Sequence, residues 1–66
     1  MDGEMIKKLV GKKVYVELNS NRRYTGIIES VDDLASPIVF VYLTDKFGEM
    51  VIFSSKETRL IQEERE

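Results

Sequence analysis

The sequence predicts an all-β domain in which five strands form one strongly bent antiparallel sheet, preceded by a short N-terminal α-helix. Three observations predict this class. Apolar residues recur at helical spacing only within about the first ten residues. From Val14 onward they recur with the period of two that is typical of half-buried strands, or in short unbroken runs that are typical of covered strands. Short groups of Asn, Ser, Asp and Gly then separate five such stretches.

The size of the chain indicates one domain whose hydrophobic core is too small to stabilise it fully. With 66 residues, the chain leaves no room for a second domain, and residues 1–66 are expected to form a single unit. Small domains commonly add disulfides, a metal or self-association, and the sequence has no Cys and no His. We therefore expect a homo-oligomer without a metal or another cofactor.

The charge balance does not by itself favour nucleic acid. Ten Lys and Arg oppose twelve Asp and Glu, which gives a net charge of −2. The strongest local concentration of cations is Arg22 and Arg23 with Lys12 and Lys13, which suits either phosphate contacts or ordinary surface charge. No apolar run has the length of a signal sequence or a membrane span, so we expect a cytoplasmic protein with no membrane partner.

The helix is predicted over residues 3–10. Asp2 suits its N-cap, and Gly11 suits a left-handed stop after it. Its apolar residues are Met5, Ile6, Leu9 and Val10. So small an apolar face favours a cover over one open end of the sheet rather than a membrane or partner helix.

The first two strands, residues 13–18 and 23–32, are predicted to form a hairpin through the polar turn at 19–21. In the second strand the alternation is interrupted at Gly26, which is followed by two adjacent apolar residues, Ile27 and Ile28. This pattern is typical of a long strand that bends to serve two sides of a small barrel.

Three further strands are predicted at residues 38–44, 49–54 and 58–62. The segment 33–37 breaks the strand pattern before the third of them. Residues 38–43 are apolar at every position, which predicts a third strand that is central or covered by a neighbour.

The order of these segments resembles the Sm-like (LSm) family, a small barrel of the SH3-like kind. The resemblance rests on the helix-to-strand junction Leu9-Val10-Gly11, on Val16-Glu17-Leu18, on Tyr24-Thr25-Gly26 followed by Ile28, and on Val31-Asp32. It extends over the whole chain in layout and implies the Sm-like barrel as the fold.

In that family the turn after the aspartate carries a residue that stacks on an RNA base and an Asn that reads the edge of the base. The resemblance places these roles near Asp32, on Leu34 and Ser36. Leucine has no π-face, and a Ser hydroxyl is shorter than an Asn amide and lacks its paired donor and acceptor.

The second family motif has an Arg or Lys followed by Gly after the fourth strand, and this chain has Phe53 and Ser54 there. Phe53 suits stacking on a base, although a Phe that closes an alternating strand is more often core or subunit contact. The resemblance also implies rings in which the fourth strand of one subunit pairs with the fifth of the next. The implied interface residues are Met50, Ile52, Leu60 and Ile61.

Two functions therefore stay open. One is a ring that binds single-stranded RNA weakly and with little base preference, and the other is a scaffold of the same fold that binds proteins instead. Without His, Cys or a phosphate-cradling glycine loop, the sequence offers no catalytic residues and predicts no enzyme. The adjacent Asp32 and Asp33 are read as solvated carboxylates rather than as a metal site.

Overall fold

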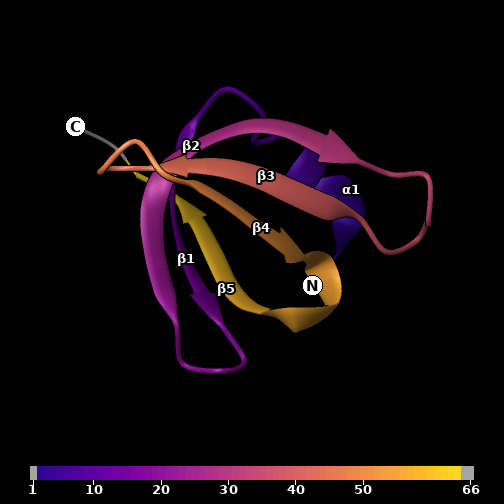
Figure 1. Ribbon diagram of the computed structural model, residues 1–66. Coiled ribbons are helices and arrows are strands. Elements are labelled where there is room, and N and C mark those ends of the chain that lie inside the picture. The colour runs from indigo at the N-terminus through magenta and orange to yellow at the C-terminus, as the bar shows by residue number, and fades with distance from the viewer. Residues whose placement is uncertain (1, 65–66) are drawn as a thin grey trace.

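A computed structural model describes residues 2–64 and contains one five-stranded antiparallel sheet preceded by a short helix (Figure 1). This confirms the predicted fold class. The elements are α1 (Gly3–Lys7), β1 (Lys13–Leu18), β2 (Arg23–Asp32), β3 (Phe40–Asp45), β4 (Met50–Ser54), a 3₁₀ turn η1 (Ser55–Glu57) and β5 (Thr58–Glu63).

The helix α1 ends at Lys7, three residues earlier than the sequence predicted. Its N-cap is Asp2, whose carboxylate accepts a hydrogen bond from the Glu4 backbone N–H at 3.0 Å. Beyond Lys7 the backbone N–H groups of Leu9 and Val10 bond to carbonyls three residues back, so the chain tightens out of α-helical geometry. Gly11 follows with a φ of 84°.

The strands lie in the order β4-β3-β2-β1-β5, so β4 and β5 form the two edges of the sheet. The sheet is strongly bent but open, because β4 and β5 do not pair with each other within residues 2–64. The strand β3 lies between β2 and β4, as its apolar sequence predicted. It begins at Phe40 rather than at residue 38, because the backbone N–H groups of Ile38 and Val39 bond outside the strand ladder, to Ala35 and to Ser55.

Gly26 allows the close approach of two strands where β2 bends. A Cβ built on Gly26 would lie 2.1 Å from the Thr44 carbonyl oxygen of β3. The pairing of β2 with β3 shifts register shortly afterwards, between Ile28 and Ser30. The bend turns Ile28 into the core while Ile27 remains half exposed. Gly26 therefore serves backbone geometry, as the interrupted alternation indicated.

The core fills the concave side of the sheet and is closed by a side chain from α1. Its buried apolar residues come from all five strands, the helix and the loop before β3: Ile6, Val14, Val16, Leu18, Ile28, Val39, Val41, Leu43, Phe53 and Ile61. The helix lies at the same end of the sheet as the loop between β2 and β3, whereas the turn between β3 and β4 lies at the other end (Figure 1). The two ends therefore present different loops.

Candidate nucleic-acid interface

The two segments in which the resemblance places RNA contacts lie side by side at the α1 end of the sheet. They are the loop of residues 33–39 and the stretch Ser54–Glu57, and we call them together the loop pair. The Val39 backbone N–H donates to the Ser55 side-chain Oγ at 3.1 Å, and the Ser55 N–H donates to the Val39 carbonyl at 2.8 Å. Both residues are buried. These two bonds hold the segments together although they are far apart in sequence.

In the first segment the backbone is shaped by hydrogen bonds within the loop. The Asp32 carboxylate accepts from the Leu34 N–H at 2.9 Å, and the Asp33 carbonyl accepts from the Ser36 N–H at 3.0 Å. Leu34 is 93% exposed, and Ser36 is exposed as well. The loop therefore presents an apolar tip and a hydroxyl to solvent.

In the second segment, Ser54 is the N-cap of η1. Its Oγ accepts from the Glu57 N–H at 3.3 Å, while the Glu57 carboxylate accepts from the Ser54 N–H at 3.2 Å. This reciprocal pair is a capping box. The Ser54 hydroxyl keeps its own proton to donate, whereas its backbone N–H already has a partner.

Phe53 lies in the core, opposite Val41, and only 2% of its surface is exposed. A base cannot reach this ring without opening the core. The placement agrees with the packing role that the sequence offered beside base stacking. Of the five residues to which the resemblance gives RNA roles, Leu34, Ser36 and Ser54 are at least partly accessible at one end of the sheet. The Asp32 carboxylate holds the turn at Leu34 through a hydrogen bond from the Leu34 N–H.

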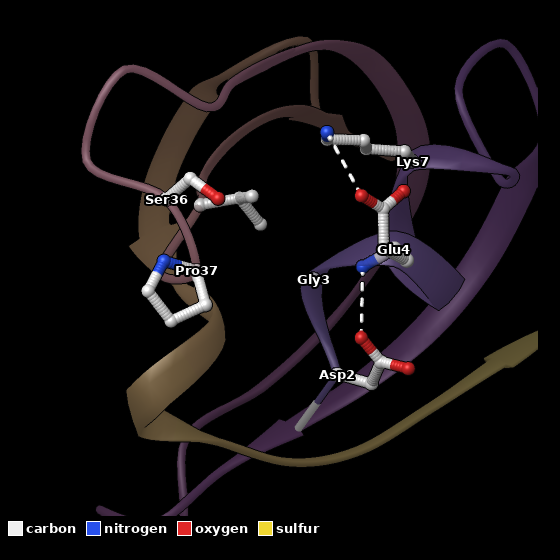
Figure 2. Close-up of a pocket in the computed structure, with 7 residues that line it drawn as sticks. Asp2, Gly3, Glu4, Lys7, Ser36 and Pro37 are labelled. Carbon is white, nitrogen blue, oxygen red and sulfur yellow. Dashed lines mark hydrogen bonds and ion pairs between the residues drawn. The ribbon is translucent and has the colours of Figure 1, made fainter.

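A small hollow separates the first turn of α1 from Ser36 and Pro37 of the loop pair (Figure 2). Its volume is about 60 Å³, which suits water rather than a base. Lys7 bridges from the helix to the loop, because its Nζ lies 2.8 Å from an Asp33 carboxylate oxygen and 3.4 Å from one of Glu4. The hydrogen bond with Asp33 raises the pKa of Lys7, and the same contact lowers the pKa of Asp33.

The charge at this end of the sheet is predominantly negative. The cations of α1, its caps and the loop pair are Lys7, Lys8 and Lys56, and the ammonium of Lys7 is already paired with Asp33. The carboxylates on α1, its cap and the loop pair, together with the end of β2, are Asp2, Glu4, Asp32, Asp33 and Glu57. Phosphate groups would meet repulsion here unless cations came from elsewhere.

The expected subunit contacts are divided between the outer surface and the core. Met50 and Ile52 project from the outer face of the edge strand β4, with 55% and 58% of their surfaces exposed. Leu60 on the other edge strand is also exposed, but Ile61 is buried opposite Val16. Three of the four implied interface residues are therefore accessible to a second chain, and Ile61 packs inside its own subunit.

A second polar cluster, which sequence reasoning missed, lies on the outer face near the β1–β2 turn. The Tyr15 hydroxyl donates to a Glu17 carboxylate oxygen at 2.5 Å, and the Arg59 guanidinium donates to the other oxygen at 3.2 Å. The hydrogen bond from Tyr15 and then that from Arg59 lower the pKa of Glu17. Arg59 also donates to the Asn21 amide oxygen at 2.9 Å. The period-two pattern puts Tyr15 and Glu17 on one face, but only the pairing of β1 with β5 brings Arg59 to them.

Within residues 2–64, no group of three or more His, Cys, Asp or Glu side chains lies close enough to hold a metal ion. The same residues contain no helix that is long and apolar enough to cross a membrane.

The family comparison matches the first half of the chain. The LSM domain model aligns with residues 4–36, which are 33 of the 66 residues and include all but the first residue of α1, the strands β1 and β2, and the start of the loop pair. The comparisons with curated proteins and with solved structures gave no match. Proteins of this family are non-enzymatic, generally associate with RNA and generally form oligomeric rings. With this match and the five-stranded bent sheet behind a short helix, the chain belongs to the LSM domain family and is an Sm-like module.

Proposed function

We propose that this Sm-like module assembles with copies of itself into a ring and binds single-stranded RNA weakly at the loop pair. The observation that carries the proposal is the pair of hydrogen bonds between Val39 and Ser55, which holds both motif segments at one end of the sheet. A rigidly held pair of loops presents Leu34, Ser36 and Ser54 together.

Ring assembly is supported by the two open edges of the sheet. Free strand edges carry unpaired backbone N–H and C=O groups, and β4 and β5 are such edges. Pairing β4 of one copy with β5 of the next would satisfy these groups and cover the exposed side chains of Met50, Ile52 and Leu60. A domain of 66 residues also gains from burying more apolar surface than its own core supplies.

Weak binding is expected because the loop pair lacks strong RNA-binding groups. Leu34 offers apolar contact but no π-face, and Phe53 is enclosed in the core. The carboxylates around the loops oppose the approach of phosphates. Base preference should be small, since Ser36 and Ser54 present single hydroxyl groups rather than paired donors and acceptors.

A second candidate is a scaffold that keeps the ring and binds proteins instead of RNA. The specific observation in its favour is the negative charge at the loop pair, where Asp33 neutralises Lys7. An acidic surface with the exposed apolar tip of Leu34 suits a basic or apolar segment of a partner protein better than it suits a phosphate backbone.

The deciding experiment is a titration of the purified protein with short fluorescent RNAs, one rich in uridine and one rich in adenine. It is run at low and moderate salt, with the oligomeric state of the same samples measured by light scattering. Affinity that falls with salt, on a ring, supports RNA binding. A ring without affinity at low salt favours the scaffold, and a monomer at all concentrations contradicts the assembly in both.

Two lysine variants test whether RNA binds at the loop pair. Leu34→Lys adds a cation at the tip of the loop pair and should tighten RNA binding and steepen the slope of log affinity against log salt by about 0.7. Ser20→Lys makes the same change of charge in the exposed β1–β2 turn and is the matched control. An equal effect of both variants would mean that only total charge matters and that the loop pair is not the site.

A further inference from the structure

The end of the sheet opposite the loop pair carries an open groove beside the β3–β4 turn. We call it the Phe47 groove, and its lining residues are Arg23, Tyr24, Thr25, Asp45, Lys46 and Phe47. Its volume is about 180 Å³. A second hollow of about 370 Å³ adjoins it, shares Thr25, Asp45 and Lys46, and continues along the bend of β2 past Gly26 and Ile27. Together they form an extended depression on the outer surface.

Phe47 stands at the mouth of this groove with 80% of its surface exposed, and its backbone is firmly anchored. The Asp45 carboxylate accepts from the N–H groups of Phe47 and Glu49, each at 2.9 Å, and the Lys46 N–H donates to the Thr25 carbonyl at 3.1 Å. Gly48 closes the turn with a φ of 83°. A large aromatic ring on a rigid turn adds nothing to the core, but it is already oriented to stack on a ligand.

Of the two cations beside the ring, Lys46 has no carboxylate partner in the described part of the chain, and Arg23 has only a long contact with one. Lys46 Nζ lies 5.4 Å from the centre of the Phe47 ring and forms no ion pair within residues 2–64. Arg23 reaches Glu17 only at 3.9 Å, and that carboxylate is already held by Tyr15 and Arg59. The carboxylate that lines the groove, Asp45, accepts two backbone N–H groups of its own turn.

We propose that the Phe47 groove is a second RNA site, in which one base of a single strand stacks on Phe47 while neighbouring phosphates contact Arg23 and Lys46. An exposed aromatic ring and two cations that line one groove match the alternation of base and phosphate along a single strand. The volume of the groove accommodates a base, and the adjoining hollow leaves room for the next nucleotide. This site goes beyond the loop pair, although it shares the premise that the module binds RNA.

The contrast between the two ends supports this assignment over a protein ligand for the groove. At the loop pair the exposed tip is aliphatic and the adjacent Lys7 is paired with Asp33. At the Phe47 groove the tip is aromatic and Lys46 has no such partner in the described part of the chain. Stacking and phosphate contact are the two components of sequence-tolerant binding to single strands. Of these two ends, as residues 2–64 describe them, the groove is the one that offers an exposed aromatic ring with cations beside it.

Two tryptophan reporters test the site. The chain contains no Trp, so Phe47→Trp and Leu34→Trp each introduce a single fluorophore at an exposed position, one in the groove and one on the loop pair. Titration with uridine-rich RNA should quench the fluorescence of Phe47→Trp through base stacking. Quenching of Leu34→Trp alone, with binding intact, would overturn the second site and leave the proposed function standing. Absence of RNA affinity in both variants and in the unaltered protein would overturn both.

Side-chain removal gives an independent measure. Phe47→Ala should weaken the binding of the same RNA about tenfold or more, as expected for the loss of one stacked base. Arg23→Gln should reduce the slope of log affinity against log salt by about 0.7, as expected for one lost phosphate contact on a single strand. Val10→Ala is the control, because it removes an exposed apolar side chain that lies outside both the groove and the loop pair. If Phe47→Ala binds RNA as tightly as the unaltered protein, or if Val10→Ala weakens binding as much as Phe47→Ala does, the groove is not the site.

Discussion

The backbone of Val39 and the side chain of Ser55 form the link between the two segments of the loop pair. The Val39 N–H donates to Ser55 Oγ at 3.1 Å, and the Ser55 N–H returns a bond to the Val39 carbonyl at 2.8 Å. Ser55 is 2% exposed, so water does not readily replace its hydroxyl. One small side chain thus joins the end of the loop before β3 to the start of η1.

Ser55→Ala should therefore destabilise the protein by about 1–3 kcal/mol, because the buried Val39 N–H loses its acceptor. Equilibrium unfolding in urea measures the change. Ser30→Ala is the control, since Ser30 is exposed on β2 and its replacement should stay within about 0.5 kcal/mol. Equal stability of the two variants would show that the Val39–Ser55 link contributes little.

Gly26→Ala should destabilise the protein by about 2–3 kcal/mol, because the new Cβ would lie 2.1 Å from the Thr44 carbonyl and force β2 and β3 apart. Gly48→Ala is the matched comparison. Its φ of 83° strains any other residue by about 1–2 kcal/mol, but no atom lies within 4 Å of the new Cβ. Thermal unfolding of both variants should rank Gly26→Ala as the less stable, and the reverse order would argue against the close strand approach.

The carboxylate of Glu17 should give the protein a pH-dependent stability on the acid side. Its pKa is lowered from the ordinary value of 4.5, mainly by the hydrogen bond from Tyr15 and then by Arg59. A lowered pKa in the folded state means that the contribution is present above the unfolded pKa and is lost as the pH falls through the folded pKa. The free energy of unfolding should thus decrease as the pH falls from neutral through the folded-state pKa of Glu17.

Tyr15→Phe removes the larger of these causes and should raise the pKa of Glu17, measured by NMR titration of its side chain. The stability difference between this variant and the unaltered protein should be largest above pH 4.5 and should shrink below it. Tyr42→Phe, on the distant strand β3, should leave the titration of Glu17 unchanged. A Glu17 pKa that does not respond to Tyr15→Phe would contradict the hydrogen bond as its cause.

Ile52→Lys should dissociate the proposed ring while the subunit stays folded. Ile52 is 58% exposed on the edge strand β4, so a charge there costs the monomer little but would be buried against a neighbouring subunit. Sedimentation velocity measures the assembly, and circular dichroism checks the fold. Ile27→Lys places the same charge on an exposed position of the inner strand β2 and should leave the ring intact. An unchanged oligomer in Ile52→Lys would exclude this face from the interface.

The prediction of the elements succeeded where the apolar spacing alone decides the backbone and missed where hydrogen bonds override that spacing. The period-two pattern around Val14 predicted strands, and Gly26 between apolar residues predicted a bend. The end of α1 at Lys7 was not foreseen, because the apolar spacing continues to Val10 while the hydrogen bonds tighten. The start of β3 was set by bonds to Ala35 and Ser55, and the latter has no local signal.

The candidate site was predictable only in outline. Resemblance indicated the loop pair, and the structure holds its two segments together. The core position of Phe53 was open in the sequence, because one face of β4 is buried and pattern alone does not say which. Phe47 was not predicted as a site residue. The available signal was its place beside Lys46 in a short turn, where no strand face can bury an aromatic side chain.

The all-β class, the order of helix and strands, and membership of the Sm-like family follow from the amino-acid sequence alone, because these depend on periodicity and on motifs along the chain. In contrast, the folded arrangement of the chain sets which charges neutralise one another and which aromatic rings stay accessible. Those properties depend on residues far apart in sequence: Lys7 meets Asp33, Arg59 meets Glu17, and Phe53 is enclosed while Phe47 is left in solvent. Strand pairing and the bend at Gly26 bring such residues together or keep them apart.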